Sequence, residues 1–315
     1  MPIGVKIILA VILVIVAVIV GISYYCYRRM FYSPKRIPLK DDEYELPDGK
    51  EYEAYKDEII AWIKWKRALE QEDIEIKAYD GLTLRGKYFE YEKGAPVEIL
   101  FHGYRGNGER DVSGGIERCF KVGRNVIIID HRASGASDGN VITFGIKEKY
   151  DCLKWIEYAV ERFGKDTKIV IGGVSMGAAT VMMAAAEELP ENVVYAIADC
   201  GYTSPKEIIC KVMREMGYPV KIFYPFAKLG AKLFGKFNLD ENSPMQAVEN
   251  AKIPILFIHG TGDEYVPCEM SERLYARCTS KKSLVLVPDA EHGLAYPKDM
   301  NGYVTAVKEF QKELM

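Results

Sequence analysis

The sequence predicts an α/β fold, in which a mostly parallel central sheet carries helices on both faces and a membrane-spanning helix precedes the domain. Two observations support this prediction. Short apolar runs of buried-strand type alternate with helical patterns over most of the 315 residues, which is typical of parallel sheets connected through helices. In addition, the segment from Ile7 to Tyr27 contains no charged residue.

The predicted α/β domain covers residues 74–315. It opens with a hairpin, Ile74–Tyr79 and Leu82–Tyr91, that turns at Asp80-Gly81. Six further apolar runs have the character of buried strands: Val97–Phe101, Asn125–Asp130, Lys168–Gly173, Val193–Asp199, Pro254–His259 and Ser283–Val287. Helical patterns intervene at Gly145–Phe163, Ser175–Glu188, Pro267–Cys278 and Asp299–Leu314.

The charge-free amino-terminal segment predicts a single membrane anchor over residues 1–27. Ile7–Ile22 is apolar without a break, and about 20 such residues in a helix span the roughly 30 Å hydrocarbon core of a bilayer. Ser23-Tyr24-Tyr25-Cys26 does not fit the small-residue site of a cleaved signal peptide. A buried core helix is a poorer interpretation, because the segment is so uniformly β-branched and apolar.

The charges around this anchor predict a single-pass protein of the cell membrane with its domain on the cytoplasmic side. Only Lys6 and the amino terminus precede the span, whereas five basic residues follow it: Arg28, Arg29, Lys35, Arg36 and Lys40. The seven cysteines are odd in number and show no C-x-x-C spacing, so we expect free thiols and a reducing compartment. The net charge of −3 with mixed signs predicts no nucleic-acid partner.

Two segments outside the alternation have their own predicted roles. Residues 28–73 are expected to form a juxtamembrane linker with an amphipathic helix at 51–71, which we expect to dock on the domain rather than lie on the membrane. The connection between Asp199 and Pro254 is much longer than a short crossover requires. Residues 202–250 within it, with helical stretches and many aromatic residues, are predicted to form a small cap over the pocket rather than a plain connection.

A serine between two glycines stands where a predicted strand meets a predicted helix. Gly173-Val174-Ser175-Met176-Gly177 follows one of the apolar runs and precedes the helix-forming Ala178–Glu188. A tight strand–turn–helix junction of this kind lifts the hydroxyl out at the carboxyl end of the sheet, and glycines on either side avoid clashes. A bare G-x-S-x-G also occurs in ordinary turns, so it is the context that predicts Ser175 as a nucleophile.

Such a serine needs a base to take its proton and an acid to orient that base. Among four histidines, His292 lies in the loop after the last apolar run, which opens at the same sheet edge as Ser175. Two acids, Asp263 and Asp199, are expected at that edge, and both precede His292 in the chain. We expect Asp263 to be the acid, because its loop neighbours the strand before His292, and Asp199 to hold a loop or the cap by hydrogen bonds.

Acyl transfer further requires N–H donors for the developing oxyanion. One expected donor is the backbone N–H of Met176, directly after the serine. The other is assigned to the backbone N–H of Tyr104, in the glycine-rich loop His102-Gly103-Tyr104-Arg105-Gly106-Asn107-Gly108. His102 and His259 are expected to be structural hydrogen-bonding residues rather than bases.

Together these segments resemble the α/β-hydrolase superfamily over roughly Ile74 to Met315. The resemblance lies in His102-Gly103, the stretch 130–139, the Ser175 junction, Gly260-Thr261-Gly262-Asp263 and Glu291-His292-Gly293. The chain looks most like the membrane-anchored bacterial branch related to the prolyl-oligopeptidase and serine-aminopeptidase-like hydrolases. The resemblance implies a triad of Ser175, Asp263 and His292, with 130–139 building a loop. One departure is Arg132-Ala133, where the superfamily usually has Arg-Gly.

The sequence therefore predicts a membrane-anchored serine hydrolase that cleaves ester-like acyl bonds, with amide bonds as a second choice. No metal or organic cofactor is expected. The expected partners are a small-molecule or peptide acyl substrate and the lipid bilayer. Two alternatives remain: a serine peptidase or aminopeptidase of the same fold, and a non-catalytic binding protein that has kept the fold.

Overall fold

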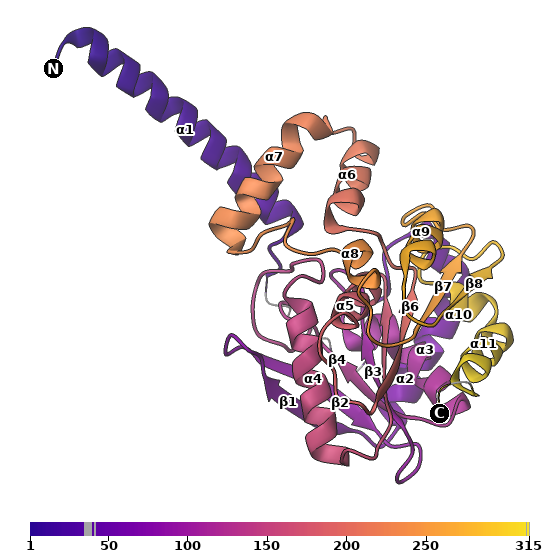
Figure 1. Ribbon diagram of the computed structural model, residues 1–315. Helices are drawn as coiled ribbons and strands as arrows, with labels where there is room; N and C mark the ends of the chain where they lie inside the picture. Colours follow the sequence, from indigo (N-terminus) through magenta and orange to yellow (C-terminus); the bar gives the residue numbers. More distant parts are fainter. Residues whose placement is uncertain (35–39, 41, 313, 315) are drawn as a thin grey trace.

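The computed structural model, which describes residues 1–34, 40, 42–312 and 314, has an eight-stranded sheet at its centre (Figure 1). Lys35, Arg36 and Pro38 of the predicted linker lie outside the described residues. The strands are β1 (Glu72–Lys77), β2 (Thr83–Phe89), β3 (Val97–Phe101), β4 (Asn125–Ile129), β5 (Ile169–Val174), β6 (Val193–Asp199), β7 (Ile255–Gly260) and β8 (Lys282–Val287). All eight strands correspond to predicted runs within two residues at each end.

The sheet has the order β1-β2-β4-β3-β5-β6-β7-β8. Hairpin β1–β2 is antiparallel and β2 also pairs antiparallel with β4, whereas the six strands from β4 to β8 along the sheet are mutually parallel. The parallel strands are almost fully buried, except for edge strand β8. This arrangement confirms the predicted fold class.

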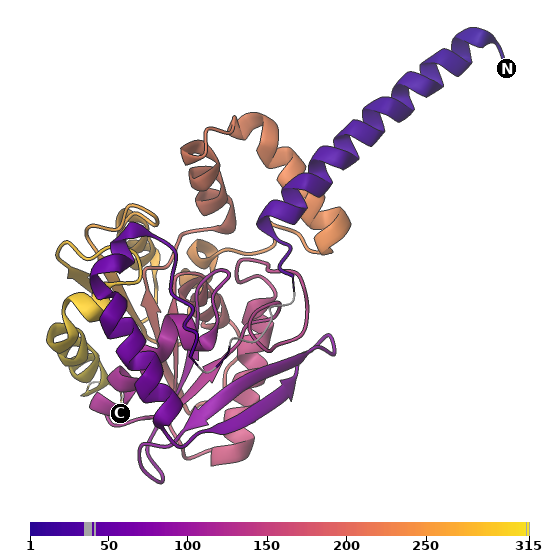
Figure 2. The same ribbon diagram turned by 180° about the vertical axis from the view of Figure 1, so that it is seen from behind.

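The described helices cover both faces of the sheet and add a projecting arm. They are α1 (Ile3–Met30), η1 (Lys50–Tyr55), α2 (Lys56–Ala68), α3 (Gly108–Lys121), α4 (Glu148–Phe163), α5 (Met176–Ala184), α6 (Pro205–Glu215), α7 (Val220–Gly230), η2 (Ala231–Gly235), α8 (Pro244–Val248), α9 (Glu269–Arg277), α10 (Ala295–Lys298) and α11 (Met300–Lys312). α4, α5 and α9 pack on one face, while α2, α3 and α11 lie on the other (Figures 1 and 2).

Helix α3 is absent from the sequence prediction, which treats its start as part of a glycine-rich loop. Asn107 caps the helix, because its side chain accepts hydrogen bonds from the N–H groups of Glu109 and Arg110. Gly114 in the middle of α3 has a low helix propensity, so the sequence of this segment does not indicate a helix. A Cβ at Gly114 would lie 2.7 Å from the ring of Trp62, so the glycine permits close packing of α2 on α3.

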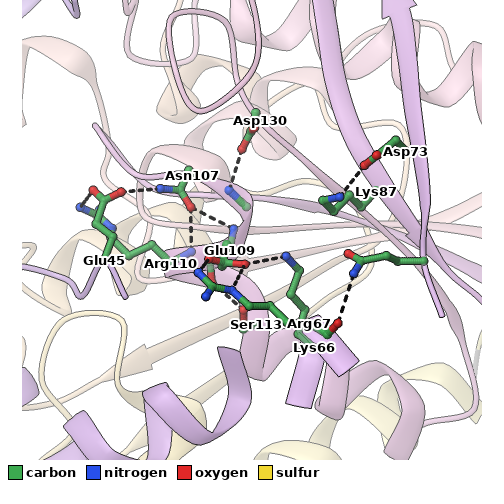
Figure 3. Close-up of polar contacts among 12 residues, drawn as sticks. Glu45, Lys66, Arg67, Asp73, Lys87, Asn107, Glu109, Arg110, Ser113 and Asp130 are labelled. Atoms are coloured by element: carbon green, nitrogen blue, oxygen red, sulfur yellow. Dashed lines mark hydrogen bonds and ion pairs between the residues drawn. The ribbon is translucent and has the colours of Figure 1, made fainter. Parts of the chain in front are cut away.

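Ion pairs fix α2 on the amino-terminal turn of α3 (Figure 3). Glu109 accepts hydrogen bonds from Lys66 at 2.8 Å and from Arg67 at 2.6 Å. Glu45 accepts a hydrogen bond from the Asn107 side-chain amide at 2.8 Å. The amphipathic helix is thus docked on the domain, and the same contacts hold the end of the glycine-rich loop that follows β3.

Helix α1 projects from the body of the protein, with the amino terminus at its far end (Figures 1 and 2). It is long and apolar enough to cross a membrane, and its most apolar part is entirely exposed. The helix runs three residues past the anchor boundary predicted at Tyr27. Nothing at that position breaks a helix, and Arg28 and Arg29 suit the last turn, where the carbonyl dipoles favour positive charge.

The base of α1 packs against α7 and η2, two helices of the segment between β6 and β7 (Figures 1 and 2). A Cβ at Gly230 would lie 2.3 Å from the carbonyl oxygen of Ser23, so only glycine permits this approach. Phe234 of η2 adds edge and tilted ring contacts to Tyr24 and Tyr27, with centroids 5.1 and 5.7 Å apart. The base of α1 is therefore packed into the domain, and α1 is not a loosely tethered appendage.

A buried cluster of charges joins β3 to α3. Glu98, fully buried in β3, pairs with Arg118 at 2.6 Å and with Arg124 at 2.5 Å. Burial raises the pKa of Glu98, but the two guanidinium groups outweigh that effect and lower the pKa to about 2. The Glu98 carboxylate is therefore ionised at neutral pH, and its negative charge is shared by two buried guanidinium groups.

Replacing Glu98 with glutamine should lower the free energy of unfolding by about 3–5 kcal/mol, because two buried guanidinium groups lose their counter-charge. Denaturant unfolding of the detergent-solubilised protein measures the loss. The matched control is Glu188→Gln, which breaks the exposed pair with Lys252 and should change stability by less than about 1 kcal/mol. Equal effects of the two substitutions would contradict the role of ionised Glu98 as the counter-charge of Arg118 and Arg124.

Candidate active site

Ser175 lies at the junction of β5 and α5 in a strained backbone conformation. Its φ of 56° and ψ of −112° fall in a region that residues other than glycine rarely occupy. A Cβ at Gly173 would lie 2.2 Å from the backbone of Gly177, and a Cβ at Gly177 would lie 2.0 Å from the carbonyl oxygen of Phe101. The two glycines are therefore required sterically, and the turn holds the Ser175 side chain at the carboxyl end of the sheet.

The three side chains predicted as a triad come together at that end of the sheet. His292 Nε2 lies 3.0 Å from Ser175 Oγ, and His292 Nδ1 lies 2.7 Å from Asp263 Oδ2. An ionised carboxylate accepts only, so Nδ1 carries the proton and Nε2 is free to accept the serine proton. Ser175 and Asp263 are buried, while His292 is partly exposed.

A second histidine contacts the Asp263 carboxylate. His259 Nε2 lies 3.1 Å from Asp263 Oδ2, and the N–H of Val266 donates to Oδ1 at 2.8 Å. Burial raises the pKa of Asp263, but the hydrogen bonds from His259 and His292 outweigh it and lower the pKa to about 2. Asp263 is thus held ionised, with both of its oxygens bonded. His259 has the structural role that the sequence predicts.

The glycine-rich loop after β3 touches the serine. A Cβ at Gly103 would lie 3.6 Å from the Ser175 Cβ, and the N–H of Gly103 already donates to Asp111 Oδ2 at 3.0 Å. Among the described residues, no backbone hydrogen bond engages the N–H of Tyr104 or of Met176. Met176 directly follows the serine in the chain, and Tyr104 directly follows Gly103.

His102 braces this loop from inside the protein. Its Nδ1 contacts the carbonyl oxygen of Gly103 at 2.7 Å, and its Nε2 accepts the N–H of His131 at 2.9 Å. Since both ring nitrogens are engaged and the side chain is fully buried, His102 is a structural residue, in agreement with the sequence prediction. It links the loop after β3 to the loop after β4.

Side chains of the same loop bind the carboxyl-terminal end of α1. The Tyr104 hydroxyl donates to the carbonyl oxygen of Met30 at 2.7 Å, and the Arg105 guanidinium donates to those of Arg29 and Tyr32 at 2.8 and 3.2 Å. The last carbonyls of a helix have no partner within it. The loop therefore caps α1, which the sequence did not indicate.

A cavity of about 490 Å³ opens at Ser175 and His292. Its walls come from the loop after β3, from α3, from the loop that carries His292 and from the juxtamembrane segment around η1. None of its described lining residues belongs to 202–250, so the expectation that this segment shapes the pocket at the serine is wrong for this cavity. α7 and η2 of that segment pack instead against α1.

Tyr52 of η1 is a site residue that sequence reasoning missed. Its hydroxyl donates to the carbonyl oxygen of His292 at 2.8 Å, and its ring lines the cavity. The two residues are 240 positions apart, and the only sequence signal was an aromatic residue in an amphipathic segment. Tyr52 holds the His292 loop from the juxtamembrane side.

Asp199 lines the same cavity but is outside the triad. Its Oδ2 accepts a hydrogen bond from the Tyr303 hydroxyl of α11 at 3.0 Å, and its Oδ1 has no partner among the described residues. Burial raises the pKa of Asp199 to about 6, against the opposing hydrogen bond of Tyr303. The expectation that Asp199 holds a loop or the cap is corrected, because its partner lies on the last helix.

One group of described residues has the spacing of a metal site: Cys200, Asp263 and His292 have donor atoms within 4.8 Å of one another. Both ring nitrogens of His292 already contact Asp263 and Ser175. Burial also raises the pKa of the Cys200 thiol well above its ordinary value, so the thiolate that a metal requires is disfavoured. The arrangement suits proton transfer better than metal binding.

A family model described as "Prolyl oligopeptidase family" matches residues 142–315, more than half of the chain. The chain belongs to the prolyl oligopeptidase family. The matched region contains all three residues of the Ser175, Asp263 and His292 arrangement. The family is part of the α/β-hydrolase superfamily, as the resemblance in the sequence implied.

Curated relatives of this prolyl oligopeptidase family member include bacterial and fungal proteins. The uncharacterized protein YqkD of Bacillus subtilis is 32% identical over 190 residues, which cover 60% of this chain and 62% of YqkD, less than two thirds of that protein. Protein bem46 of Schizosaccharomyces pombe is 26% identical over 297 residues, or 92% of this chain and 87% of bem46.

Solved structures show the same fold at low sequence identity. The Pyrococcus furiosus esterase Pf2001 superposes with a TM-score of 0.66 at 22% identity, over 90% of this chain and 98% of the esterase. Est1E from Butyrivibrio proteoclasticus, solved with ferulic acid bound, gives a TM-score of 0.60 at 22% identity, over 76% and 98% of the two chains. These likenesses establish the α/β-hydrolase fold of this chain.

Replacing Asp199 with asparagine should change stability in a pH-dependent way. The folded protein holds the Asp199 proton up to about pH 6, whereas the unfolded chain releases it near pH 4. The stability of the native protein therefore falls between these two values, and Asp199→Asn should gain up to about 3 kcal/mol relative to it above pH 6. Denaturant unfolding at pH 4 and pH 8 measures the difference. A difference that does not change with pH would contradict the raised pKa.

Proposed function

We propose that this protein is a serine hydrolase that cleaves carboxylic esters through an acyl-enzyme. The observation that carries the proposal is the continuous hydrogen-bonded series from Ser175 through His292 to Asp263, at the mouth of a cavity. The esterases among the similar folds support the same reaction class. A binding protein without catalysis would not require this series of donors and acceptors.

Each residue has a role in the proposed reaction. Ser175 Oγ attacks the ester carbonyl carbon while His292 Nε2 takes its proton, and Asp263 stabilises the resulting imidazolium. The N–H groups of Tyr104 and Met176 donate to the oxyanion. The imidazolium then gives its proton to the leaving alcohol. Water, activated by His292, cleaves the acyl-enzyme and restores Ser175.

A peptidase is the second candidate, and two observations favour it. The family description names oligopeptidases, and the carboxylates of Asp48 and Glu51 line the cavity. A carboxylate near the cavity rim would attract a substrate with a free amine. Hydrolysis of aminoacyl and peptide p-nitroanilides, compared with p-nitrophenyl esters on the same preparation, distinguishes the two reactions.

Replacing Ser175 with alanine should reduce kcat/KM for p-nitrophenyl esters by about 10⁴-fold or more, because the nucleophile is lost. The native protein should also react with a fluorophosphonate probe, and the variant should not. Ser280→Ala, far from the cavity, is the matched control and should keep both properties. Full ester hydrolysis by Ser175→Ala would refute the proposed function.

We further propose that α1 crosses the cell membrane once and leaves the catalytic domain in the cytoplasm. The positive charges after the span support this orientation. A cysteine-reactive reagent that cannot cross membranes should therefore fail to label the partly exposed Cys268 in intact cells and should label it after lysis. Labelling of Cys268 in intact cells would reverse the orientation.

A further inference from the structure

A second cavity, of about 220 Å³, lies between the base of the anchor helix and the helices that follow β6. α1 contributes Tyr25, Cys26, Arg29 and Met30 to its wall, and α6 and α7 contribute five apolar side chains. These side chains are Ile208, Ile209, Val212, Met213 and Phe223. The cavity therefore suits an apolar ligand.

This second cavity adjoins the cavity at the serine. Tyr104, Arg105 and Tyr265 line both of them. Tyr104 carries the proposed oxyanion donor, and the ring of Tyr265 lies 5.0 Å from the ring of His292. The two cavities therefore adjoin at these side chains, close to the Ser175–His292 pair.

Several hydrogen-bond donors of the shared wall already have partners in the protein. The Tyr104 hydroxyl and the Arg105 guanidinium donate to carbonyl oxygens at the end of α1. Because these groups already have partners, an apolar ligand would not leave them unsatisfied. The cap on α1 thus also makes the wall of the cavity compatible with a hydrocarbon.

The outer rim of the second cavity lies at the level where α1 leaves the membrane. The exposed apolar part of α1 ends about one turn before Tyr25, which lines the rim and is 49% exposed. Met216, also on the rim, is 56% exposed, and nearby Ile222 of α7 is 58% exposed. Exposed apolar and tyrosine side chains at this level are typical of the bilayer interface.

We propose that the second cavity binds the acyl chain of an ester lipid, which reaches Ser175 from the bilayer. This proposal rests on the proposed esterase function and names its substrate class. In the reaction the Ser175 Oγ–acyl carbon bond forms, the ester C–O bond breaks, and the lipid alcohol leaves with the proton from His292. Water then releases the fatty acid. The more polar cavity at Ser175 would accommodate the alcohol part.

The test compares acyl chains on the full-length protein reconstituted in phosphatidylcholine vesicles. The substrates are p-nitrophenyl acetate and p-nitrophenyl decanoate. Each additional methylene of the decanoyl chain that is buried in an apolar site raises kcat/KM at most about fourfold. Val212→Phe fills the cavity and should lower the decanoate-to-acetate ratio of kcat/KM about tenfold or more. Phe223→Ala enlarges the cavity and should shift the preference toward longer chains.

Ile222, next to Phe223 on α7 but outside the cavity lining, provides the matched controls. Ile222→Phe and Ile222→Ala should keep the native chain-length ratio. A Val212→Phe ratio equal to that of Ile222→Phe would refute the acyl-chain site while leaving the esterase intact. If Ser175→Ala hydrolysed both esters at the native rate, the proposed function itself would fail.

A second arm tests the bilayer as the source of the chain. Monooleoylglycerol embedded in the vesicles should be hydrolysed to oleic acid and glycerol, and Val212→Phe should reduce the release of oleic acid about tenfold or more. A protein that hydrolyses the dissolved decanoyl ester but releases no oleic acid from vesicles takes its acyl chain from water. That outcome would refute entry from the bilayer.

Discussion

The contact between the turns after β3 and β5 is the constraint on which the site depends. The backbone at Phe101 approaches Gly177 so closely that any side chain there would collide with the carbonyl oxygen. This approach brings the glycine-rich loop against Ser175, and parallel pairing of β3 with β5 sets the level at which the two turns meet. Ser175 and the loop beside it are thus positioned by backbone packing before any side-chain interaction contributes.

The glycine-rich loop beside Ser175 also caps the carboxyl-terminal end of α1. The Tyr104 hydroxyl donates to the carbonyl oxygen of Met30 in α1, and the Arg105 guanidinium donates to those of Arg29 and Tyr32. At Gly230, α7 approaches α1 closely. The base of α1, the loop after β3 and the helices after β6 therefore form one packed unit.

Much of the fold and the three central side chains followed from the sequence, because the relevant signals are local. Buried parallel strands are short apolar runs, and the Ser175 turn requires glycines on both sides. Helix α3 escaped prediction since Gly114 serves a contact with Trp62 of another helix. Tyr52 and the pairing of Asp199 with Tyr303 escaped prediction because their partners are distant in the chain.

The sequence by itself determined the α/β fold class, the apolar amino-terminal helix and the order of Ser175, Asp263 and His292 along the chain. Only the tertiary structure decided where the anchor packs and which elements line the two cavities. The physical reason is that hydrophobic periodicity and turn chemistry act within a few residues, whereas a cavity wall is set by side chains that meet after folding. Residues 202–250 were thus recognisable as an insertion, but their packing against α1 was a property of the folded protein.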